Sequence, residues 1–222
     1  MTVLGVVTIG QSPRSDMVPE LIEWLPSSVE VRERGALDGL GTAEIAALAP
    51  EPGDETLTTR LRDGSSVVIG RAGVLPRLQS AIDFLEEGGA DVVLIVCTGE
   101  FPPFRHSRPL LLAGPLLTAG LSAIAGDSLV GVICPLAEQE QQSYEKFEHL
   151  THKIKVAWAT PYQPGVTAIE EAARELAADG AQLLVLDCMG YTKAHRHAAA
   201  AASGLPVVLS RSVVARLTAE LC

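Results

Sequence analysis

The sequence predicts an α/β protein of two similar halves, each built on a parallel sheet covered by helices. Short runs rich in Val, Ile and Leu alternate with longer segments whose apolar residues recur at spacings of three and four, as buried strands alternate with amphipathic helices. Hydrophobic residues make up 47% of the 222 residues but aromatic residues only 4%. Aliphatic side chains must therefore fill the core, as in parallel sheets buried on both faces. An internal repeat is the third observation.

The repeat joins segment 89–99 to segment 180–190. Both begin with Gly-Ala, continue as an apolar run and end in Cys-x-Gly, so Cys97 and Cys188 occupy the same place at an offset of 91 residues (188 less 97). Gly-Ala before aliphatic residues is common in α/β proteins, but the shared cysteine argues against coincidence. Each cysteine is expected at the carboxyl end of a buried parallel strand.

A second internal similarity relates Gly5–Thr8 to Gly131–Cys134. On this alignment the first half is longer than the second by about 35 residues. The stretch 34–69 can hold the additional residues, and Asp63-Gly64 within it is a signature of a β-hairpin turn.

The expected strands are Val3–Thr8, Glu30–Arg34, Val67–Ile69, Val92–Val96, Leu110–Leu112, Leu129–Ile133, Lys155–Trp158, Leu183–Leu186 and Pro206–Leu209. The expected helices are Pro13–Trp24, Thr42–Ala49, Gly73–Glu87, Gly114–Ala125, Ala137–Leu150, Gly165–Ala178, Tyr191–Ser203 and Arg211–Leu221. Their alternation favours right-handed crossovers between parallel strands.

Charge and composition exclude several classes of partner. A formal net charge of −10 without a basic stripe argues against nucleic acid. No signal peptide is expected at Met1–Gly5. The uncharged run Pro109–Gly126 is broken by Gly114-Pro115, which favours a strand, a turn and a helix over a membrane span. We expect a cytoplasmic protein with reduced cysteines and no membrane partner; a homodimer is left open.

Motifs for metals and nucleotides are absent from the sequence. There is no Cys-x-x-Cys pair, no Gly-x-Gly-x-x-Gly after a strand and no Walker-type loop. His195 and His197 are two residues apart on a predicted helix and face different ways. His149 and His152 share a face but lack a visible third ligand. No metal and no cofactor are expected.

A cysteine at the carboxyl end of a parallel strand is well placed for catalysis. Ligands bind beyond these ends in open α/β sheets, and the amino end of a following helix favours a thiolate over a thiol. If Cys97 and Cys188 face one interlobe cleft, one thiolate can remove a proton from carbon while the other thiol protonates the opposite face. The alternative is two structural thiols, since free cysteine is among the most buried residue types.

Three motifs, taken in order, resemble the AroM family over the full chain. They are Gly10–Asp16 (GQSPRSD), Leu94–Phe101 (LIVCTGEF) and Asp187–Thr192 (DCMGYT). AroM proteins are similar in turn to the aspartate/glutamate racemase superfamily, which includes hydantoin racemases, maleate isomerases and arylmalonate decarboxylases.

The resemblance implies two Rossmann-like lobes with parallel sheets related by pseudo-twofold symmetry, as in the Asp/Glu racemases. The first lobe would comprise residues 1–108 and 205–222, since the last helix returns to it, and the second residues 109–204. A cofactor-independent, two-cysteine cleft is also implied. The sequence departs from the racemases beside both cysteines: Thr98-Gly99 replaces the typical Asn-Thr, and Asp187 and Met189 replace a Gly-Cys-Thr-His-like context.

Candidate ligand contacts flank the cysteines and the first strand. Arg14 has a planar fork that suits a carboxylate, and Ser12 is expected to cap the helix that starts at Pro13. Glu100 is either a second acid or base or a solvated helix-end charge. Arg71 is a weaker candidate, and nothing demands a role for Cys134. The expected site comprises catalytic Cys97 and Cys188 and the ligand contacts Thr8, Gln11, Ser12, Arg14, Thr98, Gly99, Glu100, Gly190, Tyr191 and Thr192.

The favoured function is a racemase or isomerase of a small carboxylate that uses two-cysteine acid–base chemistry. Two alternatives stay open. One is a non-catalytic protein that binds or senses a small metabolite, and the other is a decarboxylase or lyase that needs one cysteine as proton donor. The sequence does not identify the substrate.

Overall fold

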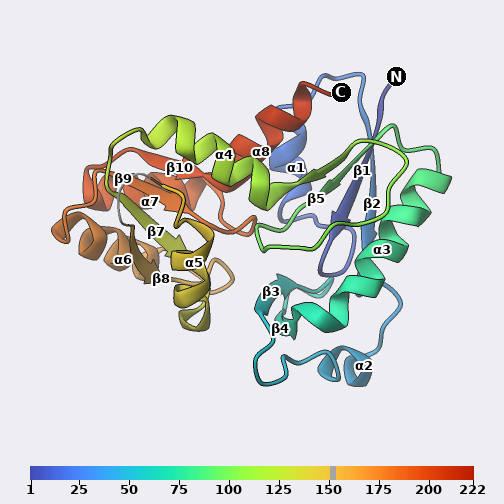
Figure 1. The fold of residues 1–222 in the computed structure, drawn as a ribbon, viewed down its shortest axis with the longest axis horizontal. Helices are drawn as coiled ribbons and strands as arrows, with labels where there is room; N and C mark the ends of the chain where they lie inside the picture. The colour runs from blue at the N-terminus through green and yellow to red at the C-terminus, as the bar shows by residue number, and fades with distance from the viewer. Residues whose placement is uncertain (151–153) are drawn as a thin grey trace. The chain divides into compact units, whose positions relative to one another are not determined.

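The computed structural model describes residues 1–150 and 154–222 (Figure 1). The chain divides into two compact units: Met1–Gly114 with Ala215–Cys222, and Pro115–Val214. Each unit is organised around its own four-stranded sheet of parallel strands. The expected α/β fold with two parallel-sheet lobes is confirmed.

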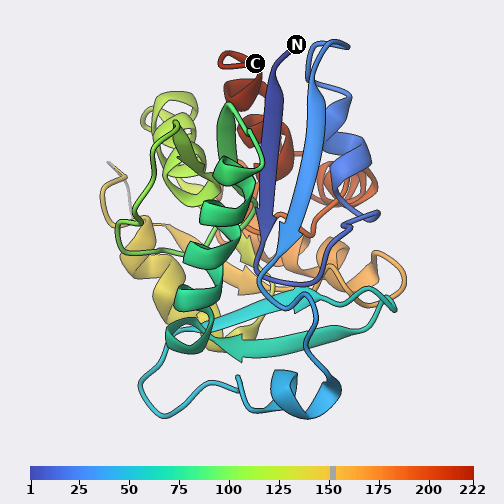
Figure 2. The same ribbon diagram turned by 90° about the vertical axis from the view of Figure 1, so that its right-hand side faces the viewer.

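The sheet of the first unit has the order β2-β1-β5-β6. Its strands are β1 (Val3–Thr8), β2 (Glu30–Gly35), β5 (Val92–Ile95) and β6 (Leu110–Leu112). Helices α3 (Arg71–Glu87) and α1 (Val18–Ile22) lie on opposite sides of β1 and β2 (Figure 2). β1 is buried along its whole length, as expected for an apolar central strand covered on both faces.

A hairpin lies between β2 and α3 in the first unit. It follows α2 (Thr42–Ala46) and consists of β3 (Thr56–Arg60) paired antiparallel with β4 (Ser66–Gly70). The turn contains Gly64 with a φ of +88°, a conformation that glycine adopts at little cost, so the hairpin predicted from Asp63-Gly64 is confirmed. Figure 2 shows the hairpin across the carboxyl ends of β1 and β2. The described residues of the second unit form no counterpart of it.

The sheet of the second unit has the order β10-β9-β7-β8. Its strands are β7 (Val130–Cys134), β8 (Lys155–Trp158), β9 (Leu183–Leu186) and β10 (Val207–Leu209). Alternate residues of β9 face opposite sides: Leu184 packs with residues of α6 (Thr167–Ala178) and α7 (Lys193–Ser203). Val185 packs with residues of α4 (Ala113–Ala125) and with Phe147, at the end of α5 (Glu140–Lys146).

The two sheets have the same topology, which explains the sequence repeat. Reading the second sheet as β8-β7-β9-β10 matches it strand for strand to β2-β1-β5-β6. The division between the units lies later in the chain than residues 108/109 and 204/205. β6 pairs with β5 in the first sheet and β10 with β9 in the second. The chain therefore passes from one unit to the other within the helix after each of these strands: α4 after β6, and α8 (Ser210–Ala219) after β10.

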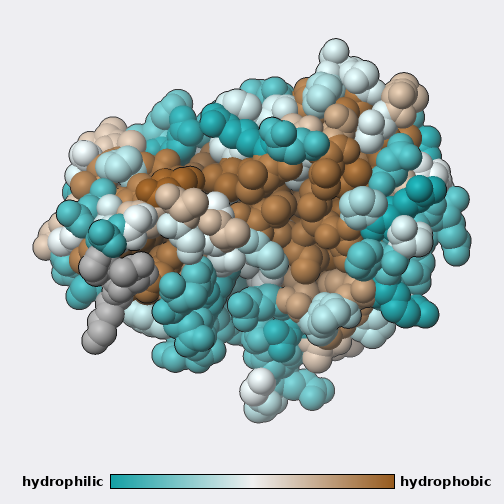
Figure 3. All heavy atoms as spheres, turned by 45° about the horizontal axis from the view of Figure 1, so that its top comes forward, coloured by the Kyte–Doolittle hydropathy of each residue, from teal (hydrophilic) through white to brown (hydrophobic). Residues whose placement is uncertain are grey.

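The uncharged run Pro109–Gly126 forms β6 and α4, as expected. Part of the apolar surface of α4 is exposed, with Ile124 55% accessible, and Figure 3 shows apolar residues on the face that carries this helix. Among the described residues, no helix is long and apolar enough to cross a membrane.

Two helices differ from their expected extents. α1 begins at Val18 instead of Pro13, with Met17 at its N-cap. The helix expected over 137–150 is a 3-10 turn, η1 (Ala137–Gln139), followed by α5, which ends at Lys146. The remaining strands and helices overlap their expected ranges.

Candidate active site

Thr8, the last residue of β1, and Cys97, two residues after β5, follow neighbouring strands of the first sheet. Val7 on β1 is in register with Ile95 on β5, and the amide of Val96 donates to the Val7 carbonyl at 2.9 Å. Thr8 is buried and Cys97 half-buried. Both residues therefore lie at the carboxyl edge of the sheet, where α/β proteins bind ligands.

The repeated Cys-x-Gly sequence forms the same turn in both units. The amide of Gly99 donates to the Cys97 sulfur at 3.5 Å, and the amide of Gly190 donates to the Cys188 sulfur at 3.3 Å. A donor directed at sulfur favours the charged thiolate over the neutral thiol. Cys188 is the more enclosed of the two, with 9% of its surface exposed.

Different side chains pack over the two turns. A Cβ on Gly99 would lie 2.9 Å from Cδ2 of Leu57 on β3, and a Cβ on Gly190 would lie 2.8 Å from the hydroxyl oxygen of Tyr162. The Cys97 turn is therefore covered by an apolar side chain of the hairpin. The Cys188 turn is covered by a phenol from the loop after β8, a neighbour that the sequence analysis missed.

Cys97 does not lie directly at the amino end of a helix, because residues 96–109 are irregular. The turn instead meets the start of α4: a Cβ on Gly114 would lie 3.0 Å from the carbonyl oxygens of Thr98 and Gly99. In the second unit, the Ser210 hydroxyl at the start of α8 donates to the Cys188 carbonyl at 2.8 Å. Each cysteine turn thus contacts the helix that follows the next strand.

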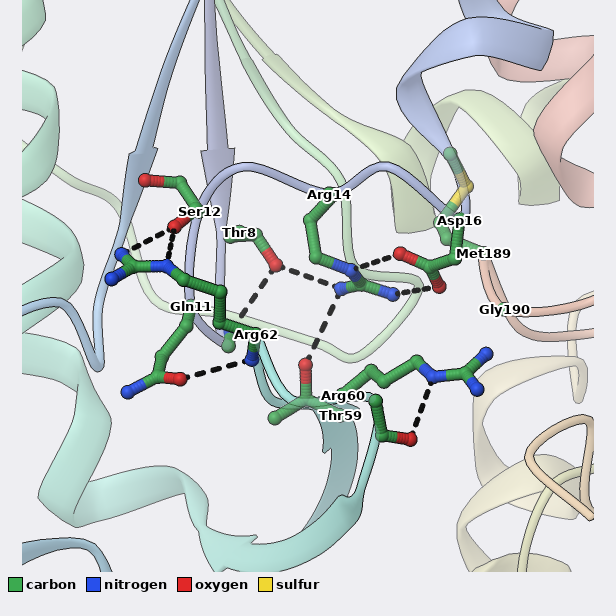
Figure 4. Close-up of polar contacts among 12 residues, drawn as sticks. Thr8, Gln11, Ser12, Arg14, Asp16, Thr59, Arg60, Arg62, Met189 and Gly190 are labelled. Atoms are coloured by element: carbon green, nitrogen blue, oxygen red, sulfur yellow. Dashed lines mark hydrogen bonds and ion pairs between the residues drawn. The ribbon is translucent and has the colours of Figure 1, made fainter.

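Arg14 is buried, with 3% exposure, and makes polar contacts through all three guanidinium nitrogens (Figure 4). Nε and Nη2 donate to the two carboxylate oxygens of Asp16 at 2.8 and 2.9 Å. Nη1 donates to the hydroxyls of Thr8 at 2.9 Å and Thr59 at 3.4 Å. The fork predicted to receive a ligand carboxylate therefore holds a carboxylate of the chain itself.

The expectation that Ser12 caps α1 is wrong. Its amide and hydroxyl donate to the two oxygens of Asp38 at 2.8 and 2.6 Å, and the Ser12–Pro13 peptide bond is cis. Gln11 accepts from the Arg62 amide at 3.0 Å, and Arg62 donates through Nε to the Ser12 carbonyl at 2.8 Å. The contacts with Asp38 hold the loop after β1 against the turn after β2, and the contacts with Arg62 hold it against the hairpin (Figure 4).

Glu100 is exposed in an irregular segment, so it is not a helix-end charge. Its carbonyl accepts from Nη1 of Arg71 at 3.3 Å, and the Arg71 guanidinium also pairs with Glu55. Acid–base chemistry by Glu100 and a ligand contact by Arg71 both stay predictions.

Tyr191 and Thr192 are engaged within the second unit. Tyr191 is fully buried and its hydroxyl donates to the Ala159 carbonyl at 2.6 Å. Burial raises the pKa of this phenol well above its ordinary value. Thr192 caps α7 by accepting from the His195 amide at 3.3 Å. Both hydroxyls support the loop after Cys188.

A buried ion pair beside Cys188 was missed by the sequence analysis. Lys146 on α5 donates to both carboxylate oxygens of Asp187 at 2.7 and 2.8 Å, and the two side chains are 8% and 6% exposed. Arg211, also buried, donates through Nη2 to the Met189 carbonyl at 2.8 Å. Asp187 ends an apolar run of the sequence, which indicates that its carboxylate needs a buried partner. No residue close to it in the sequence identified that partner as Lys146.

Cys134 is a buried neutral thiol. It contacts the carbonyl oxygens of Leu136 at 3.3 Å and Ala157 at 3.6 Å. Burial raises its pKa to about 12. No disulfide joins any two of the four cysteines. Within residues 1–150 and 154–222, no group of His, Cys, Asp and Glu side chains could hold a metal ion; His152 lies outside the described residues.

The family model described as AroM protein matches residues 4–222. The chain belongs to the AroM family. Curated protein sequences give no match to this AroM protein.

Solved racemase and decarboxylase structures share the fold of the AroM chain. Allantoin racemase from Klebsiella pneumoniae has a TM-score of 0.62 at 14% identity, over 100% of this chain and 87% of its own. Glutamate racemase from Francisella tularensis, in complex with D-glutamate, has a TM-score of 0.60 at 16% identity, over 99% and 80%. A mutant of arylmalonate decarboxylase in a liganded form has a TM-score of 0.64 at 14% identity, over 99% and 92%. The fold is that of the Asp/Glu racemases.

Proposed function

We propose that this AroM protein is a cofactor-independent racemase or isomerase of a small carboxylate, with Cys97 and Cys188 as its two proton-transfer groups. The observation that carries the proposal is the repeated Cys-x-Gly turn. It occurs at the carboxyl end of the corresponding strand, β5 or β9, in two units of equal topology, with an amide directed at each sulfur. The allantoin and glutamate racemases that share the fold support a reaction of this class.

The proton balance requires one thiolate and one thiol. The thiolate takes a proton from the carbon next to the carboxylate and becomes an S–H group, while the electron pair of the broken C–H bond stays on the substrate. The other thiol then protonates the opposite face of that carbon and becomes a thiolate. The Gly99 and Gly190 amides stabilise whichever sulfur is charged, because a hydrogen bond to a charged acceptor is stronger than one to a neutral acceptor.

A one-cysteine decarboxylase or lyase is the second candidate. It is favoured by the unequal exposure of the two thiols, since Cys97 is half-buried and Cys188 is buried, and by the fold shared with arylmalonate decarboxylase. In that reaction a single thiol protonates the carbanion left by the loss of carbon dioxide. A non-catalytic metabolite-binding protein would need neither proton transfer.

We further infer that the ligand is a small carboxylate, that Thr98, Gly99 and Gly190 lie beside it, and that the protein works in the cytoplasm without a cofactor. The ligand contacts rest on the position of these residues at the sheet edges that carry the cysteines. The location rests on cysteines that end apolar strands and are expected to be reduced.

A thermal-shift screen of small chiral carboxylates, followed by incubation of each hit in D2O, tests the proposal. NMR loss of the α-proton signal together with loss of optical rotation is the expected result. C97S and C188S should each lower the inversion rate about 100-fold or more, the usual contribution of a positioned acid or base, while C222S should leave it unchanged. Tight binding without exchange would identify a binding protein instead.

A further inference from the structure

The Arg14–Asp16 pair has the geometry of a ligand complex. Two adjacent guanidinium nitrogens of Arg14 donate to the two oxygens of one carboxylate at 2.8 and 2.9 Å. This parallel, bidentate arrangement is the one in which arginine recognises the carboxylates of small molecules. Asp16 thus occupies the side of the fork that an external carboxylate would need (Figure 4).

Arg14 is held in place independently of Asp16. Its Nη1 donates to Thr8 at the end of β1 and to Thr59 on β3, and its backbone amide donates to Glu33 on β2 at 2.6 Å. The loop itself lies against the hairpin, because a Cβ on Gly10 would be 2.4 Å from the Thr59 hydroxyl oxygen. Contacts from β1 and β3 therefore hold the guanidinium, and a contact from β2 holds the Arg14 backbone, before any ligand arrives.

Asp16 is the more accessible member of the pair. Its side chain is 21% exposed, against 3% for Arg14, and it lies in the turn before α1 begins at Val18. Nη1 keeps its contacts with Thr8 and Thr59 if the Asp16 carboxylate leaves Nε and Nη2.

We propose that Asp16 is an internal substitute for the ligand's carboxylate, and that ligand binding exchanges one carboxylate for the other on Arg14. This inference rests on the proposed function, of which it names the carboxylate subsite and its competitor. The exchange keeps the buried guanidinium paired before and after binding, so it avoids the large cost of an uncompensated buried charge. Asp16 then determines how strongly a ligand must bind, because the ligand carboxylate has to bind Arg14 more favourably than a carboxylate only two residues away in the chain.

Malonate binding to the full-length protein tests the exchange without any turnover. The Arg14 Nε–H resonance, assigned by its loss in R14K, is followed by 15N NMR during a malonate titration of wild type and D16N. We expect a saturable shift in wild type and a dissociation constant at least about tenfold lower in D16N, because an apparent dissociation constant is the intrinsic one divided by the open fraction. D179N is the control: it removes the same charge from a side chain that is 52% exposed in the second unit, and should bind malonate as wild type does.

Two results overturn the inference: an Arg14 resonance that does not move with malonate, or D16N affinity equal to that of wild type. If D16N does not fold, the wild-type titration decides, since exchange must also move the 13C signal of the Asp16 carboxylate. Proton exchange from a substrate is measured separately. A protein that shows the carboxylate exchange but no turnover retains this inference and loses the proposed function.

Discussion

Replacing Lys146 with Met should strongly destabilise the second unit and alter Cys188. The substitution removes the ammonium group but keeps most of the apolar stem, so Asp187 is left charged at 6% exposure without its bidentate partner. Removing one partner of a buried pair costs about 3–5 kcal/mol. With a denaturant slope of about 2 kcal/mol/M, the urea midpoint should fall by roughly 1.5–2.5 M.

The double variant K146M/D187L provides the control. Replacing a buried pair by apolar residues of similar volume is often neutral or stabilising, so the double variant should recover most of the lost stability. Urea unfolding followed by far-UV circular dichroism measures both. K146M should also slow alkylation of Cys188, because a carboxylate one residue away, no longer balanced by the Lys146 ammonium group, disfavours the thiolate. A K146M midpoint within about 0.3 M of wild type would refute the assignment of a buried, coupled pair, since that shift corresponds to less than about 1 kcal/mol.

Three further predictions concern the thiols and the hairpin. At pH 6.5 iodoacetamide should label at least one strand-end cysteine of the Cys-x-Gly turns before Cys222, whose pKa is raised by burial; peptide mass spectrometry showing Cys222 first would contradict this. G10A should cost about 1–3 kcal/mol through overpacking, because its Cβ would be 2.4 Å from the Thr59 hydroxyl oxygen. The control G41A has nothing nearer than 3.7 Å, so it should cost less, with only the loss of a glycine N-cap to α2. Cys134, with a pKa raised by burial from 9.0 to about 12, contributes stability that is complete below pH 9 and lost as pH rises toward 12. The urea midpoint should therefore fall less between pH 8 and pH 10.5 in C134A than in wild type, and equal falls would exclude the effect.

The local pattern of the sequence was sufficient for the sheets and for the cysteine turns. Alternating apolar runs and helical periodicity depend on neighbours along the chain, so β1, β8 and β9 have their expected bounds. The 91-residue offset between Cys97 and Cys188 correctly indicated two units of equal topology. The Asp-Gly signature also located the hairpin that lengthens the first unit.

The contacts that shape the candidate site depend on partners distant in the chain. Ser12 was expected to cap a helix, but its partner Asp38 lies 26 residues away and draws it into a different turn. Arg14 meets Thr59, 45 residues away, and Lys146 meets Asp187, 41 residues away. Such pairings are set by how the elements pack, and no periodicity along the sequence reports them.

Proton exchange measured separately for the two enantiomers of one substrate tests the two-cysteine mechanism most directly. Each enantiomer of a thermal-shift hit is incubated in D2O with wild type, C97S or C188S, and loss of its α-proton is followed by NMR. The mechanism predicts that C97S loses exchange of one enantiomer and C188S exchange of the other, because each thiolate removes the proton from one face. A serine variant that abolishes exchange of both enantiomers, while the other variant retains both, would contradict it and indicate one-cysteine chemistry.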